Sequence, residues 1–202
     1  NDPITMLGSK SISERMYLLN TCSKIIFNSQ WSKKQFLSRL DKFYHKSAKL
    51  EVIHQSIKKT ETNIKNKKKI ITFVGKLNSA KGYDIFCKAI TKILDKHKDW
   101  SAIVVGDEPR ENIVVEHKRL QNLGFKNHDE VLNIFGKSSI AVACARWNEP
   151  FGRSSLEAAS KGCAVIISNR GGLPETITNG IILRLLTPNQ LFKSIEELIT
   201  DK

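Results

Sequence analysis

Four continuous apolar segments constrain the fold of this chain more than any other feature. They are residues 70–74, 102–105, 140–143 and 164–167, and isoleucine and valine make up most of them. Segments that are apolar throughout are typical of strands buried on both faces of a parallel sheet. Helical patterns separate these segments, which indicates repeated strand–helix units. The sequence therefore predicts an α/β, Rossmann-like parallel sheet with helices on both faces.

The helical patterns between the strands differ in strength. The clearest covers residues 85–94, where apolar side chains recur at the spacing of one helix face. Further helices are expected near residues 111–123, 129–136, 152–161 and 173–178, with a last helix that carries Leu191, Ile195 and Leu198. Gly162 suits the end of the helix at 152–161, and residues 181–185 suit a fifth strand.

Residues 1–46 form a pattern of their own. A helix is expected from Ser13, followed by a short buried strand around Ile25 and a second helix with Ser29 or Ser32 as its N-cap. A lysine-rich stretch then precedes the repeated strands. We therefore expect two units, residues 1–46 and residues 47–202. The start at Asn1 has no methionine and no signal pattern, so we expect it to be a cut end.

The charge of the chain favours anionic partners. Lysine and arginine number 33 against 20 aspartate and glutamate residues, a net charge of +13. Such a surplus suits phosphorylated ligands, acidic lipid or nucleic acid, although a solvated lysine-rich surface explains it equally well. Nucleic acid is the least favoured partner, because no recognition helix with clustered arginine and no paired stacking aromatics are visible. We expect no nucleic-acid binding.

Cysteine and histidine residues give no sign of a metal centre. The four cysteines lie apart among apolar residues, and the five histidines lack the spacing of metal ligands. Free, buried thiols, no metal and no cofactor are expected, as in a reducing cytoplasm. No apolar run approaches the roughly 18 residues that a membrane span requires.

Ligands of parallel α/β sheets bind beyond the carboxyl ends of the strands, so we expect the functional residues in the loops that follow the strands. The first of them runs from Gly75 to Gly82 and carries Lys76 and Lys81. Two ammonium groups beside a helix start suit a diphosphate. Lysines next to a glycine turn are nevertheless more often simple surface residues.

The loop after the third strand carries two acids. Glu149 lies in the loop, and Glu157 lies within the helix that follows Gly152 and Arg153. A glycine lets a ligand approach the backbone, and the helix start offers unpaired N–H groups to a phosphate. Glu157 is placed to accept hydrogen bonds from a ribose diol. Alternatively, Glu157 is only a first-turn charge favoured by the helix dipole, and Glu149 an exposed loop acid.

The loop after the fourth strand pairs Gly171 with Gly172, and Pro174 follows at a helix start. This is a tight turn with accessible backbone N–H groups, equally consistent with an ordinary connection. Taken together, the loops resemble retaining glycosyltransferases of the GT-B fold in family four, the group 1 glycosyltransferases. The matching segments are 75–82, 106–107, 149–158 and 171–175, in family order over residues 69–185. Asn1-Asp2-Pro3, Glu14-Arg15 and Phe27-Asn28-Ser29 resemble the end of that family's N-terminal domain.

The resemblance implies a role for each matching residue. Lys76, where the family has arginine, and Lys81 would neutralise the donor diphosphate, and Glu149 would hold the transferred sugar. Glu157 would bind the ribose. Backbone groups of the remaining predicted residues, Gly75, Phe151, Gly152, Arg153, Gly171 and Gly172, would contact sugar or phosphate. Two departures stand out: Lys76 lacks the arginine fork, and Arg153 replaces an apolar residue.

The implied function is transfer of a hexose, with retention of configuration, from a nucleoside-diphosphate sugar to a glycan or lipid-linked acceptor in cell-envelope polysaccharide synthesis. This chain would be the C-terminal donor-binding domain after a remnant of the N-terminal domain, inactive by itself. Two alternatives stay open: another GT-B enzyme such as a nucleotide-sugar 2-epimerase, and a non-catalytic nucleotide-sugar-binding module. We expect a cytoplasmic location with peripheral contact at an anionic inner membrane surface. The base, sugar, acceptor and oligomeric state are left open.

Overall fold

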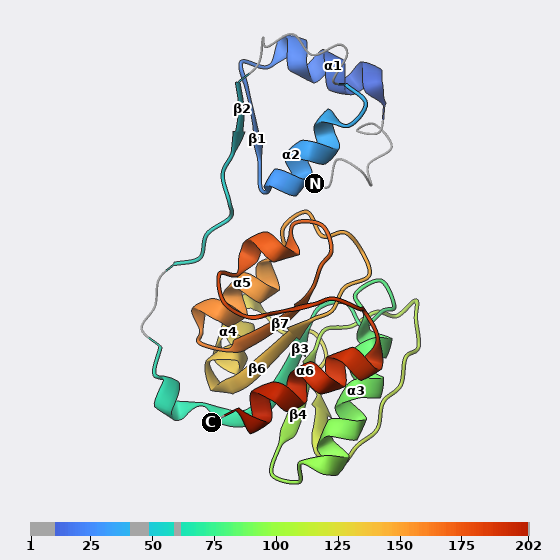
Figure 1. Ribbon diagram of the computed structural model, residues 1–202, viewed down its shortest axis with the longest axis vertical. Coiled ribbons are helices and arrows are strands. Elements are labelled where there is room, and N and C mark those ends of the chain that lie inside the picture. The colour runs from blue at the N-terminus through green and yellow to red at the C-terminus, as the bar shows by residue number, and fades with distance from the viewer. Residues whose placement is uncertain (1–10, 41–48, 59–61, 202) are drawn as a thin grey trace.

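The protein consists of a small unit and a larger α/β unit. A computed structural model describes residues 11–40, 49–58 and 62–201, and the predictions made for Asn1-Asp2-Pro3 lie outside these residues. In Figure 1 the small unit lies above the larger one, and an extended segment after β2 joins them at one side.

The small unit is a two-stranded parallel sheet with two helices. Its elements are α1 (Ile12–Thr21), β1 (Lys24–Phe27), α2 (Gln30–Leu37) and β2 (Lys49–Val52). Ser29 caps α2 by accepting a hydrogen bond from the Ser32 N–H, as its position in the sequence predicts. Because β2 pairs with β1, this sheet continues past residue 46, where the first unit was expected to end.

The larger unit is the parallel sheet that the apolar segments predict. Its strands are β3 (Lys68–Val74), β4 (Ser101–Val105), β5 (Leu120–Asn122), β6 (Ser138–Ala143), β7 (Ala164–Ser168) and β8 (Ile181–Leu183). The spatial order is β5-β4-β3-β6-β7-β8, and every neighbouring pair is parallel. This is the strand order of dinucleotide-binding folds, which reverses its direction between β3 and β6.

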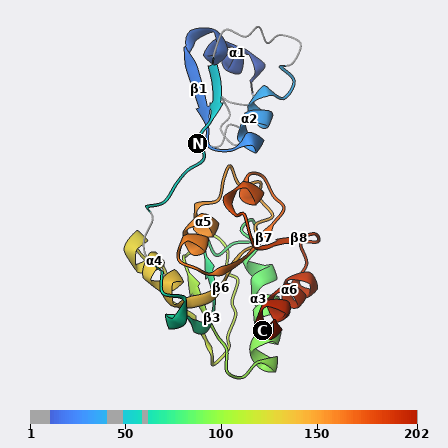
Figure 2. The same ribbon diagram turned by 60° about the vertical axis from the view of Figure 1, so that its left-hand side comes forward.

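Helices cover both faces of this sheet. They are α3 (Tyr83–Lys96), α4 (His128–Lys137), α5 (Arg153–Ser160) and α6 (Pro188–Thr200), with 3-10 turns η2 (Ile64–Asn66) and η3 (Leu173–Thr176). Helices α3 and α6 lie side by side on one face, while α4 and α5 cover the other, as Figures 1 and 2 show together. Each pair encloses one apolar cluster, centred on Phe86 and on Phe135 respectively. The predicted fold class is confirmed.

One predicted helix is wrong. Residues 111–119 are irregular and lead into β5, where a helix over 111–123 was expected. Ile113 and Val115 pack against the core, whereas the intervening Val114 is 66% exposed. Burial of every second residue belongs to extended chain, which the β-branched side chains favour. The helix expected near 173–178 is the single turn η3.

Candidate functional site

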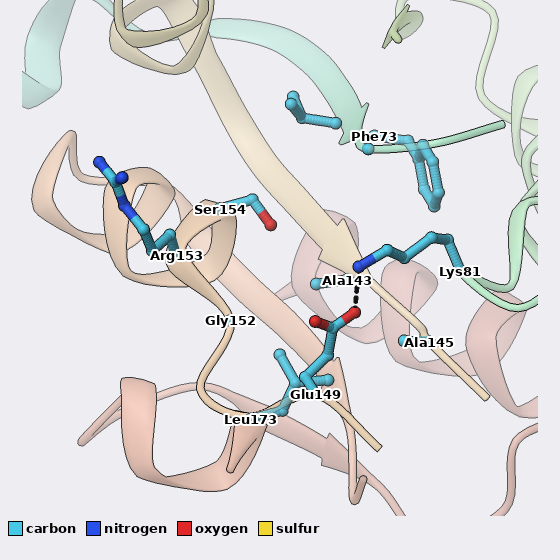
Figure 3. A pocket seen from close by; sticks show the side chains of 11 residues that line it. Phe73, Lys81, Ala143, Ala145, Glu149, Gly152, Arg153, Ser154 and Leu173 are labelled. Atoms are coloured by element: carbon cyan, nitrogen blue, oxygen red, sulfur yellow. Dashed lines mark hydrogen bonds and ion pairs between the residues drawn. The ribbon is translucent and has the colours of Figure 1, made fainter. Parts of the chain in front are cut away.

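A cavity of about 270 Å³ opens at the carboxyl edge of the sheet, between the ends of β3 and β6. This is where the strand order reverses, the place where open parallel sheets bind ligands. It is lined by Phe73, Val74, Gly75, Lys81, Ala143, Ala145, Glu149, Gly152, Arg153, Ser154 and Leu173. Figure 3 shows these side chains around one hollow, with Lys81 and Glu149 directed toward each other.

The loop after β3 orients Lys81. Within it, the Asn78 side chain accepts a hydrogen bond of 2.9 Å from the Lys81 N–H. Gly82 then begins α3 with a left-handed φ of 74°. A Cβ atom at Gly82 would lie 1.9 Å from the carbonyl oxygen of Cys144, so only glycine permits this approach. The approach brings the loop against the end of β6.

Further bonds join the same loop to the chain beyond β6. The N–H groups of Arg146 and Trp147 both donate to the Ala80 carbonyl, at 2.9 and 3.0 Å. The Arg146 guanidinium also binds both oxygens of Asp84, at 2.5 and 2.7 Å. This pairing holds the pKa of Asp84 below its usual value. The two loops therefore act as one structure at the cavity rim.

Lys81 and Glu149 form an ion pair across the cavity. The Glu149 side chain is only 14% exposed, against 33% for Lys81. Moving both charged groups partly out of water costs solvation free energy, and their mutual attraction must offset this cost. A ligand that offers an anion to Lys81 and a hydrogen-bond donor to Glu149 would compete with this pair.

The start of α5 supplies a second electropositive feature. Gly152 is its N-cap, with no side chain capping the first N–H groups, and Arg153 and Ser154 line the cavity beside it. Unpaired N–H groups and the positive end of the helix dipole are suited to an anion. A phosphate in the cavity would meet this helix start and Lys81 together.

Glu157 lies behind this helix start and is 8% exposed. Its Oε1 atom is 3.2 Å from Arg153 Nη2 and 3.7 Å from His128 Nδ1. Glu157 itself does not line the cavity, but it contacts Arg153, which lies one turn earlier on α5 and does line it. His128 was not singled out from the sequence, because its place at the start of α4 gives no sign that Glu157 lies opposite.

The other predicted residues take different positions. Lys76 is exposed and does not line the cavity. Phe151 is buried, and its ring stacks on His54 with centroids 5.6 Å apart. Gly171 and Gly172 lie behind the Glu149 segment, where the Gly172 N–H donates to the Glu149 carbonyl at 2.6 Å. Phe73, Ser154 and Leu173 line the cavity without having been predicted.

The cysteine beside the cavity is buried, and the described residues contain no cluster of metal ligands. Burial raises the pKa of Cys144 beside the cavity to about 12, so its thiol stays protonated near neutral pH. Cys87, Cys144 and Cys163 are free and buried, as predicted, while Cys22 is partly exposed. Within residues 11–40, 49–58 and 62–201, no three histidine, cysteine or acidic side chains are grouped as metal ligands. No helix in that part of the chain is long and apolar enough to span a membrane.

Comparison with known sequences identifies relatives. The profile described as "Glycosyl transferases group 1" matches residues 54–202. Spore coat protein SA of Bacillus subtilis (strain 168) is 32% identical over 153 residues, covering 66% of this chain and 40% of that protein. The D-inositol 3-phosphate glycosyltransferase of Corynebacterium diphtheriae is 26% identical over 149 residues, covering 66% of this chain and 35% of that enzyme. The matched part of the chain thus covers only 40% and 35% of the length of these two curated relatives.

Comparison with solved structures identifies the type of fold. HepE of Anabaena, crystallised in complex with UDP and glucose, superposes with a TM-score of 0.76 at 18% sequence identity. The likeness covers 98% of this chain and 59% of HepE, and includes the small unit as well as the larger one. At this identity it shows the fold. Because the profile covers residues 54–202, the chain belongs to the family of group 1 glycosyl transferases, and its fold is that of part of a GT-B enzyme.

Proposed function

We propose that this chain carries the donor site of a retaining hexosyltransferase, which moves a sugar from a nucleoside-diphosphate sugar to a glycan or lipid-linked acceptor. The observation that carries the proposal is the meeting of Lys81, Glu149 and the α5 start at one cavity. A cation, a carboxylate and a helix start match the diphosphate and sugar of such a donor. The complex of HepE with UDP and glucose supports this choice of ligand.

In this proposal the donor separates the ion pair. The diphosphate takes Lys81 and the helix start, while a sugar hydroxyl donates a hydrogen bond to Glu149. Negative charge grows on the diphosphate as its bond to the anomeric carbon breaks. Lys81, Arg153 and the α5 dipole then stabilise the leaving group electrostatically and without a metal. Glu157 binds the ribose beyond Arg153, and Lys76 reaches the phosphates from the rim.

The family resemblance further implies that the acceptor attacks the front face of the donor sugar, so that the anomeric configuration is retained. It also implies an acceptor in the cell envelope, a cytoplasmic location and peripheral contact with anionic lipid. Two alternative functions fit the same cavity: that of a nucleotide-sugar 2-epimerase, and that of a non-catalytic module that binds a nucleotide sugar. They predict donor binding too, so product analysis must separate them from the transferase.

Calorimetric titration with UDP, GDP, ADP and their glucose conjugates tests the donor site directly. We expect one nucleotide to bind, its glucose conjugate to bind more tightly, and EDTA to leave both affinities unchanged. Absence of binding by all six would refute the donor site. For the full-length enzyme, NMR of the product distinguishes an axial from an equatorial new bond, and an inverted anomeric centre would refute retention. An epimerised free sugar would favour the epimerase.

A further inference from the structure

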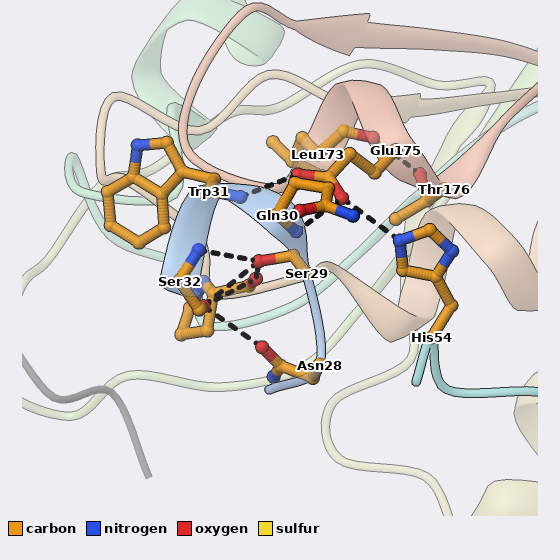
Figure 4. A network of polar contacts seen from close by, with 10 residues as sticks. Asn28, Ser29, Gln30, Trp31, Ser32, His54, Leu173, Glu175 and Thr176 are labelled. Carbon is orange, nitrogen blue, oxygen red and sulfur yellow. Dashed lines mark hydrogen bonds and ion pairs between the residues drawn. The ribbon is translucent and has the colours of Figure 1, made fainter. Parts of the chain in front are cut away.

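Glu175 of η3 joins the two units at the N-terminus of α2. Its Oε2 accepts a hydrogen bond of 2.7 Å from the Gln30 N–H, and its Oε1 accepts one of 2.9 Å from the Trp31 N–H. Oε2 also lies 3.0 Å from Nε2 of His54, in the segment after β2. Figure 4 shows the carboxylate between the helix start and the imidazole. The sequence predicts no role for Glu175 beyond its place in the matching segment 171–175.

A second set of bonds joins the same helix to the Glu149 loop. The hydroxyls of Ser29 and Ser32 both donate to the Pro150 carbonyl, at 2.6 and 3.2 Å. Pro150 directly follows Glu149. A Cβ atom at Gly172 would lie 2.4 Å from the Pro150 oxygen and 2.9 Å from Ser29 Oγ, so the Gly172 backbone lies close to both the Pro150 carbonyl and the Ser29 side chain. The start of α2 therefore rests against the segment that carries Glu149.

η3 connects these contacts to the rest of the cavity. The Glu175 N–H donates to the Gly172 carbonyl at 3.0 Å, and the Gly172 N–H binds the Glu149 carbonyl. On its other side, the Thr176 hydroxyl is 2.8 Å from that of Ser155 in the first turn of α5. One short turn thus contacts the small unit, the Glu149 backbone and the helix start. A carboxylate that accepts two N–H bonds at a helix start makes charge-assisted bonds, which are stronger than neutral ones.

From these contacts we infer that Glu175 is a positioning residue: by holding α2 against Pro150, it keeps Glu149 directed into the cavity at the junction of the two units. The inference rests on the proposed function, because Glu149 is taken to bind the transferred sugar. The backbone of Lys81 is bound within its own loop, and Glu157 contacts Arg153 and His128, all of them in the larger unit. Loss of the Glu175 bonds should therefore affect recognition of the sugar and spare recognition of the nucleotide.

The test compares two dissociation constants for each variant of this chain. Titration with the tightest-binding of UDP, GDP and ADP, and with its glucose conjugate, gives the factor by which the sugar improves affinity. We expect Glu175→Gln to reduce that factor about tenfold, the loss of one hydrogen bond to a charged group, with nucleotide affinity unchanged or tighter, because a displaced Glu149 competes less for Lys81. Small-angle X-ray scattering should show a larger radius of gyration. Ser29→Ala, which removes the shorter bond to Pro150, should change both quantities in the same direction.

Glu130→Gln is the matched control. Glu130 also accepts an N–H bond at a helix start, from Asn127 at 3.0 Å, but this bond lies within the larger unit. Its substitution should change neither the sugar factor nor the radius. An unchanged sugar factor in both Glu175→Gln and Ser29→Ala, or an equal loss of nucleotide and nucleotide-sugar affinity, would overturn the positioning role alone. A wild-type chain that binds no nucleotide sugar would overturn the proposed function itself.

Discussion

Lys81 and Glu149 belong to different strand–helix units, yet they form an ion pair across one cavity. Two backbone hydrogen bonds to Ala80 and the close contact of Gly82 with Cys144 bring their loops together. Lys81, Glu149 and the start of α5 thus line the same cavity.

Replacing Lys81 by alanine should weaken nucleoside-diphosphate binding about 10- to 100-fold, the range for losing a hydrogen bond between charged groups. The corresponding nucleoside without phosphates should bind as it does to the wild type, because it never reaches Lys81. Calorimetry with the two ligands measures both effects. Lys88→Ala, an exposed lysine on α3, is the control. Equal affinity of Lys81→Ala and Lys88→Ala for the diphosphate would remove Lys81 from the site.

Glu149→Gln should tighten nucleotide binding and reduce the factor by which the sugar improves affinity. Without the carboxylate, Lys81 has no competing partner and the cavity loses a negative charge, so the nucleoside diphosphate should bind more tightly. The glucose conjugate should gain less over the nucleotide, because an amide oxygen accepts weaker hydrogen bonds than a carboxylate. Titration of both ligands decides the matter. If the variant lost affinity for the nucleoside diphosphate, the proposed exchange of partners would be wrong.

Glu157→Gln should weaken nucleoside-diphosphate binding about tenfold, through loss of charge-assisted bonds to the ribose. Inorganic pyrophosphate, which has no ribose, should bind equally well or more tightly, because Arg153 no longer faces a carboxylate 3.2 Å away. Competition between the two ligands measures the ratio. A parallel loss for both would assign Glu157 to the structure of α5 and not to the ribose.

The Asp84–Arg146 pair should make stability depend on acid pH. Because the pairing lowers the pKa of Asp84 in the folded state, its contribution is present above the ordinary aspartate value of 3.8 and is lost as pH falls through the lower folded value. Asp84→Asn should cost about 1 kcal/mol at pH 7 and nothing at the acid end. Urea unfolding at several pH values measures this. A cost that stays constant down to the most acidic pH would exclude the linkage.

Gly82→Ala should destabilise the protein by more than about 3 kcal/mol, because the new Cβ overlaps the Cys144 carbonyl. Gly124 is the matched control, since it has a similar φ of 64° with nothing within 4 Å of the built Cβ. Its replacement by alanine should cost only about 1 kcal/mol, the strain of the left-handed backbone. Chemical denaturation measures both. Equal costs would show that the contact with Cys144 is unimportant.

The sequence by itself determined most of the local structure and the loops from which the cavity is built. Continuous apolar segments can only be buried on two faces, so the strands, the parallel sheet and the loops that carry Lys81, Glu149 and Gly152 were predictable. The extended course of residues 111–119 was not, because Ile113, Val114 and Val115 form a short continuous apolar run, and such a run does not distinguish a strand from a helix. Three-residue strands such as β5 contain too few residues to show any period.

Only the tertiary structure decided which of these residues meet. Lys81 and Glu149 are 68 positions apart, and Glu175 reaches Gln30 across 145. Such contacts depend on strand order and on close backbone approaches, which local pattern does not encode. The same packing put Lys76 on the surface and turned Gly171 and Gly172 toward the Glu149 backbone. Propensity and periodicity act over a few neighbouring residues, whereas a cavity forms where distant segments pack together.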